Sequence, residues 1–179
     1  MKHATLAAVV LAAISSVNVA SASDGTITFN GELLATTCNV TVDGQAADAS
    51  VALPVVGVSQ LSSTGATAGQ TKFSIDLSNC EGTLNTATAF FEAGSTVDSN
   101  GRLSNTGTAG TNVSLQLRDA GNTNQPVIVV GNSSQNTNNY YGEITNGSLT
   151  LPYLVEYYAN QPTIPGLVES NVTYSIIYK

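Results

Sequence analysis

Hydrophobic and polar residues alternate along much of the chain, with the period of two that places every second side chain on one face of a β-strand. The alternating segments span residues 38–42, 50–56, 71–80, 86–92, 112–119, 126–130 and 148–158. Turn sequences such as Asp-Gly and Asn-Gly separate them. No segment shows a helical period. The pattern therefore predicts an all-β fold, an antiparallel sandwich of many short strands.

Two more alternating segments lie near the ends of the chain. In residues 171–179 the apolar face consists of Val172, Tyr174, Ile176 and Tyr178. In residues 24–34 the corresponding face consists of Gly25, Ile27, Phe29, Gly31 and Leu33. The C-terminal strand has no later strand with which to pair. The N-terminal strand could fold back onto its own domain, or it could add to a neighbouring molecule by β-augmentation.

The first 22 residues have the organisation of a secretory signal peptide. A basic start, Met1-Lys2-His3, precedes an apolar run at 4–14 and the small residues Ala20-Ser21-Ala22. The apolar run is too short for a transmembrane helix. We expect cleavage after Ala22, which leaves 179 − 22 = 157 residues that form one domain.

The predicted export determines how the two cysteines are interpreted, because disulfides form in oxidising compartments. Cys38 and Cys80 are expected to form a disulfide, which closes a loop of 80 − 38 = 42 residues. This bond would stabilise the fold by roughly 3–4 kcal/mol.

Loss of Lys2 leaves 5 − 1 = 4 basic against 12 acidic residues, a net charge of −8. This charge argues against nucleic acid and anionic membranes as partners, and no other apolar run could embed the chain in a bilayer.

The chain after the signal peptide contains few residues of the types that act in catalysis or bind metal ions. The only histidine, His3, is removed with it, and no tryptophan or methionine remains. Ser-His-Asp and Cys-His arrangements are therefore excluded, and a zinc site would need carboxylates alone. A hydrolase with two carboxylates remains possible in principle, although no acid pair stands out. We expect no catalytic residue, metal or cofactor. A monomeric extracellular binding module is the other alternative.

Several motifs, in this order, resemble the chaperone–usher fimbrial subunits of Gram-negative bacteria, close to the type 1 fimbrial pilins. They are GTITFNGELLATTCNV (25–40), FSIDLSNC (73–80), NVSLQLRDAGN (112–122) and NGSLTLPYLVEYYA (146–159). The C-terminus fits as well, with an aromatic residue next to last, Tyr178, and a glycine fourteenth from the end, since 179 − 166 + 1 = 14 identifies Gly166. The resemblance covers essentially all of the chain after the signal peptide.

This resemblance implies an incomplete immunoglobulin-like β-sandwich that lacks its final strand. The pilin domain would span residues 35–179, and residues 23–34 would be a donor strand that completes another subunit. A groove beside the C-terminal strand would expose the core. The residues implied in the groove and in chaperone binding are Gly166, Val172, Tyr174, Ile176, Tyr178 and Lys179.

The resemblance also implies partners and a location. A periplasmic chaperone would fill the groove first, and its basic residues would bind the carboxylate of Lys179. At the outer-membrane usher the donor strand of the next subunit would replace the chaperone. The product would be a surface fimbria that supports cell adhesion. The Thr-rich composition favours a major shaft subunit, whereas the short Ser23-Asp24 segment before Gly25 leaves a minor or adaptor subunit as the alternative.

Overall fold

The computed structural model describes residues 25–31 and 37–179, and its contacts divide the chain into two units, Met1–Leu33 and Leu34–Lys179. The signal-peptide prediction lies outside the described residues. In the first unit, residues 25–31 have no regular secondary structure and are exposed. The part of the chain that the structure describes contains no helix with the length and hydrophobicity of a membrane span.

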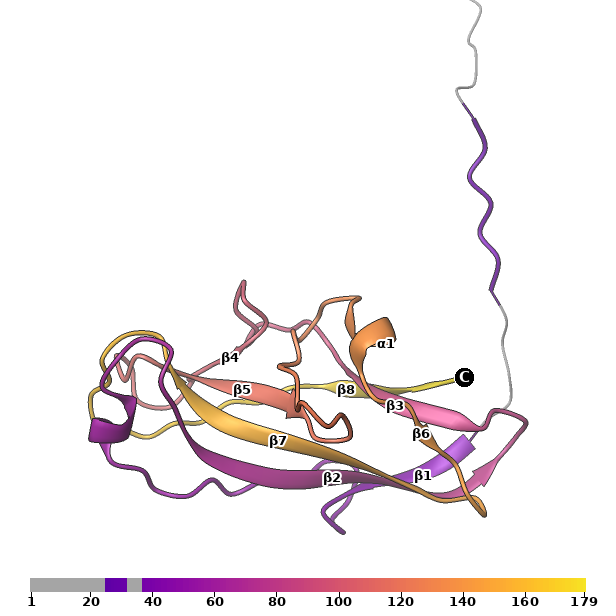
Figure 1. Ribbon diagram of the computed structural model, residues 1–179, viewed down its shortest axis with the longest axis horizontal. Coiled ribbons are helices and arrows are strands. Elements are labelled where there is room, and N and C mark those ends of the chain that lie inside the picture. The colour runs from indigo at the N-terminus through magenta and orange to yellow at the C-terminus, as the bar shows by residue number, and fades with distance from the viewer. Residues whose placement is uncertain (1–24, 32–36) are drawn as a thin grey trace, which may run out of the picture. The chain divides into compact units, whose positions relative to one another are not determined.

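The second unit consists of two antiparallel sheets with very little helix (Figure 1). The larger sheet has the order β1-β2-β7-β5-β4 and the smaller one β6-β3-β8. The strands are β1 (Thr37–Val42), β2 (Thr67–Glu81), β3 (Thr86–Phe91), β4 (Leu103–Ser104), β5 (Val113–Asp119), β6 (Gly142–Glu143), β7 (Leu149–Ala159) and β8 (Tyr174–Tyr178). The only helices in this unit's described part are η1 (Val58–Leu61) and α1 (Gln135–Asn138). The predicted all-β fold is confirmed.

Most of the predicted strands form, but two do not. The expectations at 38–42, 71–80, 86–92, 112–119 and 148–158 correspond to β1, β2, β3, β5 and β7. The predictions for 50–56 and 126–130 are wrong, because neither segment is a strand. In the first, Pro54 has no N–H group for a ladder. In the second, pairing is limited to an isolated bridge between Arg118 and Val127 and a few separate backbone bonds.

The core lies between the two sheets, where the alternating apolar faces meet. Ile75 of β2 and Leu151 and Tyr153 of β7 are almost fully buried, as is Phe91 of β3. The Tyr153 ring meets Phe91 edge-on at 5.1 Å between centroids. Its hydroxyl accepts a hydrogen bond from the Ala89 backbone N–H at 3.1 Å, which satisfies the polar end of this buried side chain.

The predicted disulfide is present and joins the start of β1 to the end of β2. The neighbouring hairpin turn is anchored to it, because the Cys80 N–H donates to the carbonyl oxygen of Gly147 at 3.0 Å. Asn146 and Gly147 have φ angles of 51° and 72°, a left-handed conformation that Asn-Gly sequences adopt readily. The covalent and hydrogen-bonded links hold three neighbouring segments together at this end of the domain.

The face of the larger sheet that points away from the core carries a buried ion pair. Glu156 of β7 is 3% exposed and accepts a hydrogen bond from Arg118 Nε of β5 at 2.6 Å. Gln116 Nε2 donates to the same carboxylate at 2.8 Å. A buried carboxylate is tolerated when it is paired and hydrogen-bonded in this way. The contacts link β5 to β7 across the middle of the sheet.

Candidate functional site

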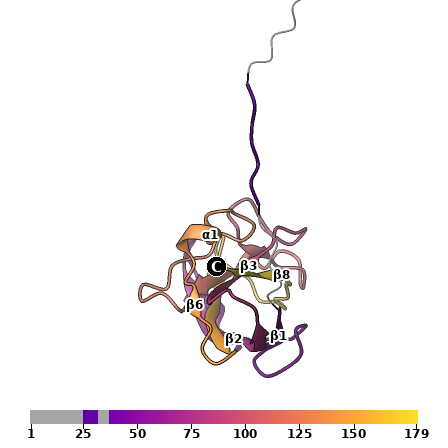
Figure 2. The ribbon, with the colours of Figure 1, turned by 90° about the vertical axis from the view of Figure 1, so that its right-hand side faces the viewer.

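The most prominent feature of the domain is an apolar groove of about 830 Å³ that opens between the two sheets. It lies on the side where β1 and β8 are edge strands, and Figure 2 shows both strands on the same side of the domain. Core side chains of both sheets line it, including Val42, Ile75, Phe91, Leu117 and Val155. The floor of the groove is therefore formed by residues of the hydrophobic core.

One wall of the groove is β8, whose outer edge is free. β8 pairs with β3 in an antiparallel register from Ala87↔Tyr178 to Phe91↔Tyr174. Within the described part of the chain, no strand pairs with its other edge. A free edge presents unpaired N–H and C=O groups that can bind another strand. The groove thus has an apolar floor and, along β8, backbone N–H and C=O groups with which another strand can pair.

The residues predicted on the apolar face of the last strand have the expected alternation. Val172, Tyr174 and Ile176 line the groove and are half-buried, whereas Thr173 and Ser175 are exposed. These three apolar side chains pack against the core cluster and are only partly buried. Their remaining exposed surface is available to a ligand that enters the groove.

The opposite wall comes from the segment 47–53, which follows β1. Val51 and Leu53 of this segment pack against the core. The Tyr174 hydroxyl donates to the carbonyl oxygen of Ala47 at 2.9 Å and so joins the two walls. Burial raises the pKa of the Tyr174 hydroxyl, and the nearby Asp48 raises it further. The hydroxyl therefore remains protonated and able to donate at neutral pH.

Three other predicted residues lie outside the groove lining. Gly166 is in the loop before β8, where an added Cβ would lie 2.7 Å from Thr111 Cγ2. This close approach explains a glycine at that position. Tyr178 is half-buried against the core. The Lys179 carbonyl oxygen accepts hydrogen bonds from the backbone N–H groups of Asn85 and Thr86 at 3.1 and 3.0 Å.

The predicted donor residues carry exposed apolar side chains. Ile27 is 79% and Phe29 is 88% exposed. Gly25 and Gly31 flank them, whereas Leu33 lies outside the described residues. Exposure of two large apolar side chains two residues apart is a feature of segments that bind an apolar partner.

Much of the groove lining was not predicted from the sequence. The segments 47–53 and 168–171 and the floor residues Leu103 and Leu115 were not identified as site residues. The sequence did mark part of this lining: Val51 and Leu53 alternate with other residues in 50–56, and this alternation predicted a strand. The alternation reflects contact with the groove floor and not a ladder of backbone hydrogen bonds.

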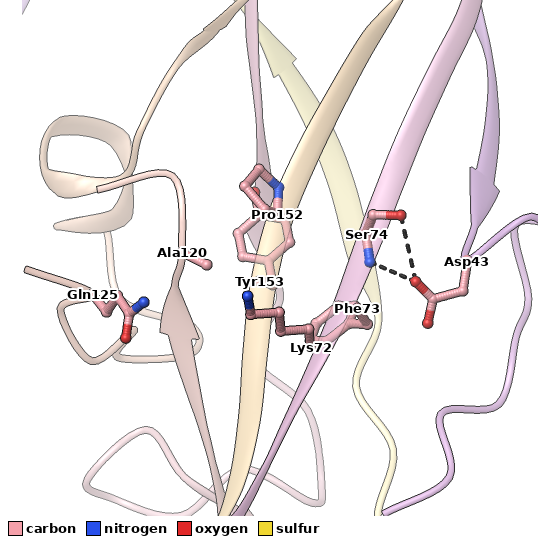
Figure 3. A pocket seen from close by; sticks show the side chains of 8 residues that line it. All are labelled: Asp43, Lys72, Phe73, Ser74, Ala120, Gln125, Pro152 and Tyr153. Carbon is pink, nitrogen blue, oxygen red and sulfur yellow. Dashed lines mark hydrogen bonds between the residues drawn. The ribbon is translucent and has the colours of Figure 1, made fainter. Parts of the chain in front are cut away.

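A second, smaller hollow of about 360 Å³ lies over β2 and β7 (Figure 3). Its charged lining residues are Asp43 and Lys72. Asp43 Oδ1 already accepts a hydrogen bond from the Ser74 backbone N–H at 2.7 Å. In the described ranges, no group of three metal-ligating side chains occurs. The hollow offers no arrangement with evident chemistry, so the groove remains the candidate site.

Comparisons with known proteins identify the family of this chain. The family model of the type-1 fimbrial protein, A, matches residues 53–179. The chain is 45% identical over 163 residues to the major fimbrial subunit SMF-1 of Stenotrophomonas maltophilia, covering 89% of this chain and 95% of that protein. It is 34% identical over 176 residues to the F17 fimbrial protein of Escherichia coli, covering 95% of each.

Solved structures show the same fold. A subunit from the structure of a chaperone–usher pilus superposes with a TM-score of 0.59 at 19% identity, covering 88% of this chain and 96% of that one. The P pilus rod subunit PapA gives a TM-score of 0.58 at 14% identity, covering 79% and 99%. The sandwich is therefore of the incomplete immunoglobulin-like type. Together, the family match and the curated relatives establish that this chain belongs to the type-1 fimbrial protein family and is a structural fimbrial subunit.

Proposed function

We propose that this protein is the major shaft subunit of a surface fimbria and polymerises by donor-strand exchange. Residues 23–34 of one copy would enter the groove of the next copy and pair with the free edge of β8. The observation that carries this proposal is the apolar groove of about 830 Å³ beside that edge. The related major fimbrial subunit SMF-1 supports a shaft position over a minor or adaptor one.

The donor segment has the chemistry that the groove requires. Ile27, Phe29 and Leu33 share one face at intervals of two or four residues. Burial of each side chain would contribute roughly 1.5–3 kcal/mol. Backbone hydrogen bonds to β8 would fix the register, because a shift by one residue would turn the apolar face towards solvent. Gly25 and Gly31 would occupy places where the groove is shallow.

The same groove makes assistance during export necessary. An unfilled groove leaves apolar side chains of its walls, such as Val172, Tyr174 and Ile176, partly exposed, which favours aggregation. We infer that a periplasmic chaperone covers it with a strand, binds the carboxylate of Lys179 through basic residues, and delivers the subunit to an outer-membrane usher. There the donor strand of the next subunit replaces the chaperone. The assembled fimbria would lie on the cell surface and support adhesion, a structural role without catalysis.

A complementation melt tests the proposal. The domain comprising residues 35–179 is produced without the donor segment, and its melting temperature is measured with and without a peptide of residues 23–35. Three buried side chains would contribute about 4.5–9 kcal/mol. Since 1 kcal/mol shifts the melting temperature of a domain of this size by about 2–4 °C, we expect a rise of about 10 °C or more.

The peptide variants provide the controls. Ile27→Asp and Phe29→Asp place a charge on the face that would enter the groove, and each should abolish most of the rise. Thr28→Asp carries the same charge on the opposite face and should retain it. A truncated domain that is already stable and does not respond to the peptide would contradict the proposal. Such a result would favour a monomeric extracellular binding module.

A further inference from the structure

The donor segment contains the pair Asn30-Gly31, which can undergo a reaction of its own backbone. In an Asn-Gly pair, the backbone nitrogen of the glycine can attack the side-chain carbonyl carbon of the asparagine, because glycine has no Cβ to hinder the approach. Asn30 and Gly31 are both exposed, in a stretch without regular secondary structure. An added Cβ at Gly31 would meet no atom within 4 Å, so its surroundings leave room for this reaction.

The chain contains two other Asn-Gly pairs, and the fold restrains both. In the pair at 100–101, the glycine is buried and its N–H donates to the Asp98 carbonyl oxygen at 3.0 Å. In the pair at 146–147, both residues are held in a left-handed turn, whose glycine carbonyl oxygen accepts from the Cys80 N–H at 3.0 Å. The attack requires rotation of the backbone, which these contacts oppose. Asn30 is therefore the least restrained of the three.

The reaction needs only water and is balanced without an oxidant or a reductant. The Gly31 nitrogen forms a bond to Asn30 Cγ and gives up its proton, and the side-chain nitrogen leaves with that proton as ammonia. Water then opens the resulting cyclic imide. Cleavage of the new bond to Cγ gives aspartate, whereas cleavage of the original peptide bond gives isoaspartate, in which the main chain runs through Cβ and Cγ.

The two products would act differently in a donor strand. Asn30 lies on the face opposite Ile27 and Phe29, so an aspartate there would remain in solvent. Isoaspartate adds a methylene group to the main chain and lengthens it by about 1.5 Å. This is nearly half the rise of one strand residue, about 3.3 Å. Ile27 and Phe29 could then not occupy their places in the groove together with Leu33.

Pairing within the groove would suppress the reaction. A strand bound along the free edge of β8 has an extended backbone, and its N–H and C=O groups take part in a ladder of hydrogen bonds. The Gly31 nitrogen would then reach Asn30 Cγ only after local opening of the strand. The same two residues would be reactive before assembly and protected after it.

We propose that Asn30-Gly31 is a site of spontaneous deamidation and isomerisation, which inactivates subunits that remain unassembled. The effect on assembly rests on the proposed function, because it requires residues 23–34 to bind as a strand. Formation of isoaspartate would limit the time for which a free subunit can donate its strand. Filaments would therefore exclude subunits whose donor strand has been lengthened.

Peptide mapping by mass spectrometry tests the site in the chain of residues 23–179. The chain is incubated at slightly alkaline pH as dilute unassembled subunits, as filaments, and unfolded in guanidinium chloride. In unassembled subunits Asn30 should react at least about tenfold faster than Asn100 or Asn146, because the turns at those positions must open first. The three positions should react at similar rates in the unfolded chain, and filaments should protect Asn30. Equal rates in folded subunits, or an unprotected Asn30 in filaments, would overturn the inference.

A competition experiment separates this inference from donor-strand exchange. When a partly modified preparation is concentrated to form filaments, the filaments should contain at least about tenfold less isoaspartate at position 30 than the chains left unassembled, because a shifted register weakens binding. Aspartate at position 30 should enter the filaments. Equal isoaspartate in both fractions would overturn the inference alone. Fresh, unmodified chains that form no filaments would instead overturn donor-strand exchange, and with it the effect on assembly.

Two substitutions provide matched controls. Asn30→Gln requires a larger ring for the same attack and leaves the apolar face unchanged, so this variant should keep its ability to polymerise during an incubation in which the wild type loses it. Asn100→Gln makes the same change at an exposed asparagine outside the donor segment and should lose this ability as fast as the wild type. Equal loss in the Asn30→Gln variant and the wild type would overturn the inference.

Discussion

Replacement of Gln135 by leucine should destabilise the pilin domain, because this buried side chain takes the place of a missing strand partner. Gln135 lies in α1 and is 2% exposed. Its Oε1 accepts from the Phe91 N–H at 2.9 Å, and its Nε2 donates to the Phe91 carbonyl oxygen at 2.9 Å. β6 pairs with β3 only at Thr86 and Ala87, so the Gln135 amide continues this edge of β3.

The size of the effect follows from these contacts. Without the amide, the buried Phe91 N–H loses its acceptor, which costs about 1–3 kcal/mol. The Phe91 carbonyl oxygen loses one of two donors, since the Gly131 N–H also reaches it at 2.9 Å. That loss costs about 0.5–1.5 kcal/mol. We therefore expect Gln135→Leu to lower the free energy of unfolding by about 1.5–4.5 kcal/mol in equilibrium urea unfolding followed by circular dichroism.

Two further variants make the reasoning refutable. Gln161→Leu changes an exposed glutamine in the same way and should be nearly neutral. Gln135→Glu places a carboxylate against the Phe91 carbonyl oxygen, so it should destabilise at neutral pH. Burial and this carbonyl oxygen should raise the pKa of the new carboxyl above its ordinary value, so stability relative to the wild type should recover at acidic pH, where the protonated acid can donate. A fully stable Gln135→Leu variant, or no acid recovery, would refute the proposed role.

Two other predictions concern ionisation and the disulfide. Burial raises the pKa of Tyr153 to about 12 from 10.0, so its stabilising contribution is complete below pH 10.0 and is lost as the pH rises through about 12. Urea unfolding at alkaline pH should show that the free energy of unfolding falls as the pH rises, and Tyr153→Phe should reduce this fall. An equal fall in both proteins would contradict the prediction. Replacement of Cys38 and Cys80 by alanine should lower the free energy of unfolding by about 3–4 kcal/mol, without a change in the far-ultraviolet circular dichroism of the folded state. Unchanged thermal stability would show that the bond does not restrain the unfolded chain.

The open groove relates the stability of this protein to its proposed function. Val172, Tyr174 and Ile176 pack against the core on one side and keep part of their surface exposed. Completion of these contacts by a donor strand would provide the free energy for polymerisation. By the same reasoning an isolated subunit would be poorly stable, which is why we propose that a chaperone covers the groove before assembly.

The fold class, the disulfide and the family could be predicted from the order of residues along the chain. Alternation in 71–80, 112–119 and 148–158 was sufficient to predict strands, because each of these segments has one face in a core. The two cysteines in an exported chain had one evident pairing. The order of motifs identified the fimbrial resemblance, and the family comparison confirmed it.

The pairing of the strands and the surroundings of the groove could not be predicted in this way, because both depend on the three-dimensional packing. A period of two is the same for every strand, so it cannot assign β7 to a place between β2 and β5. It also cannot tell a laddered strand from the segment 50–56, whose apolar residues contact the groove floor without backbone pairing. The paired Glu156 and the bridging Gln135 depend on contacts between residues distant in sequence. Such contacts arise from packing in three dimensions, which local periodicity does not encode.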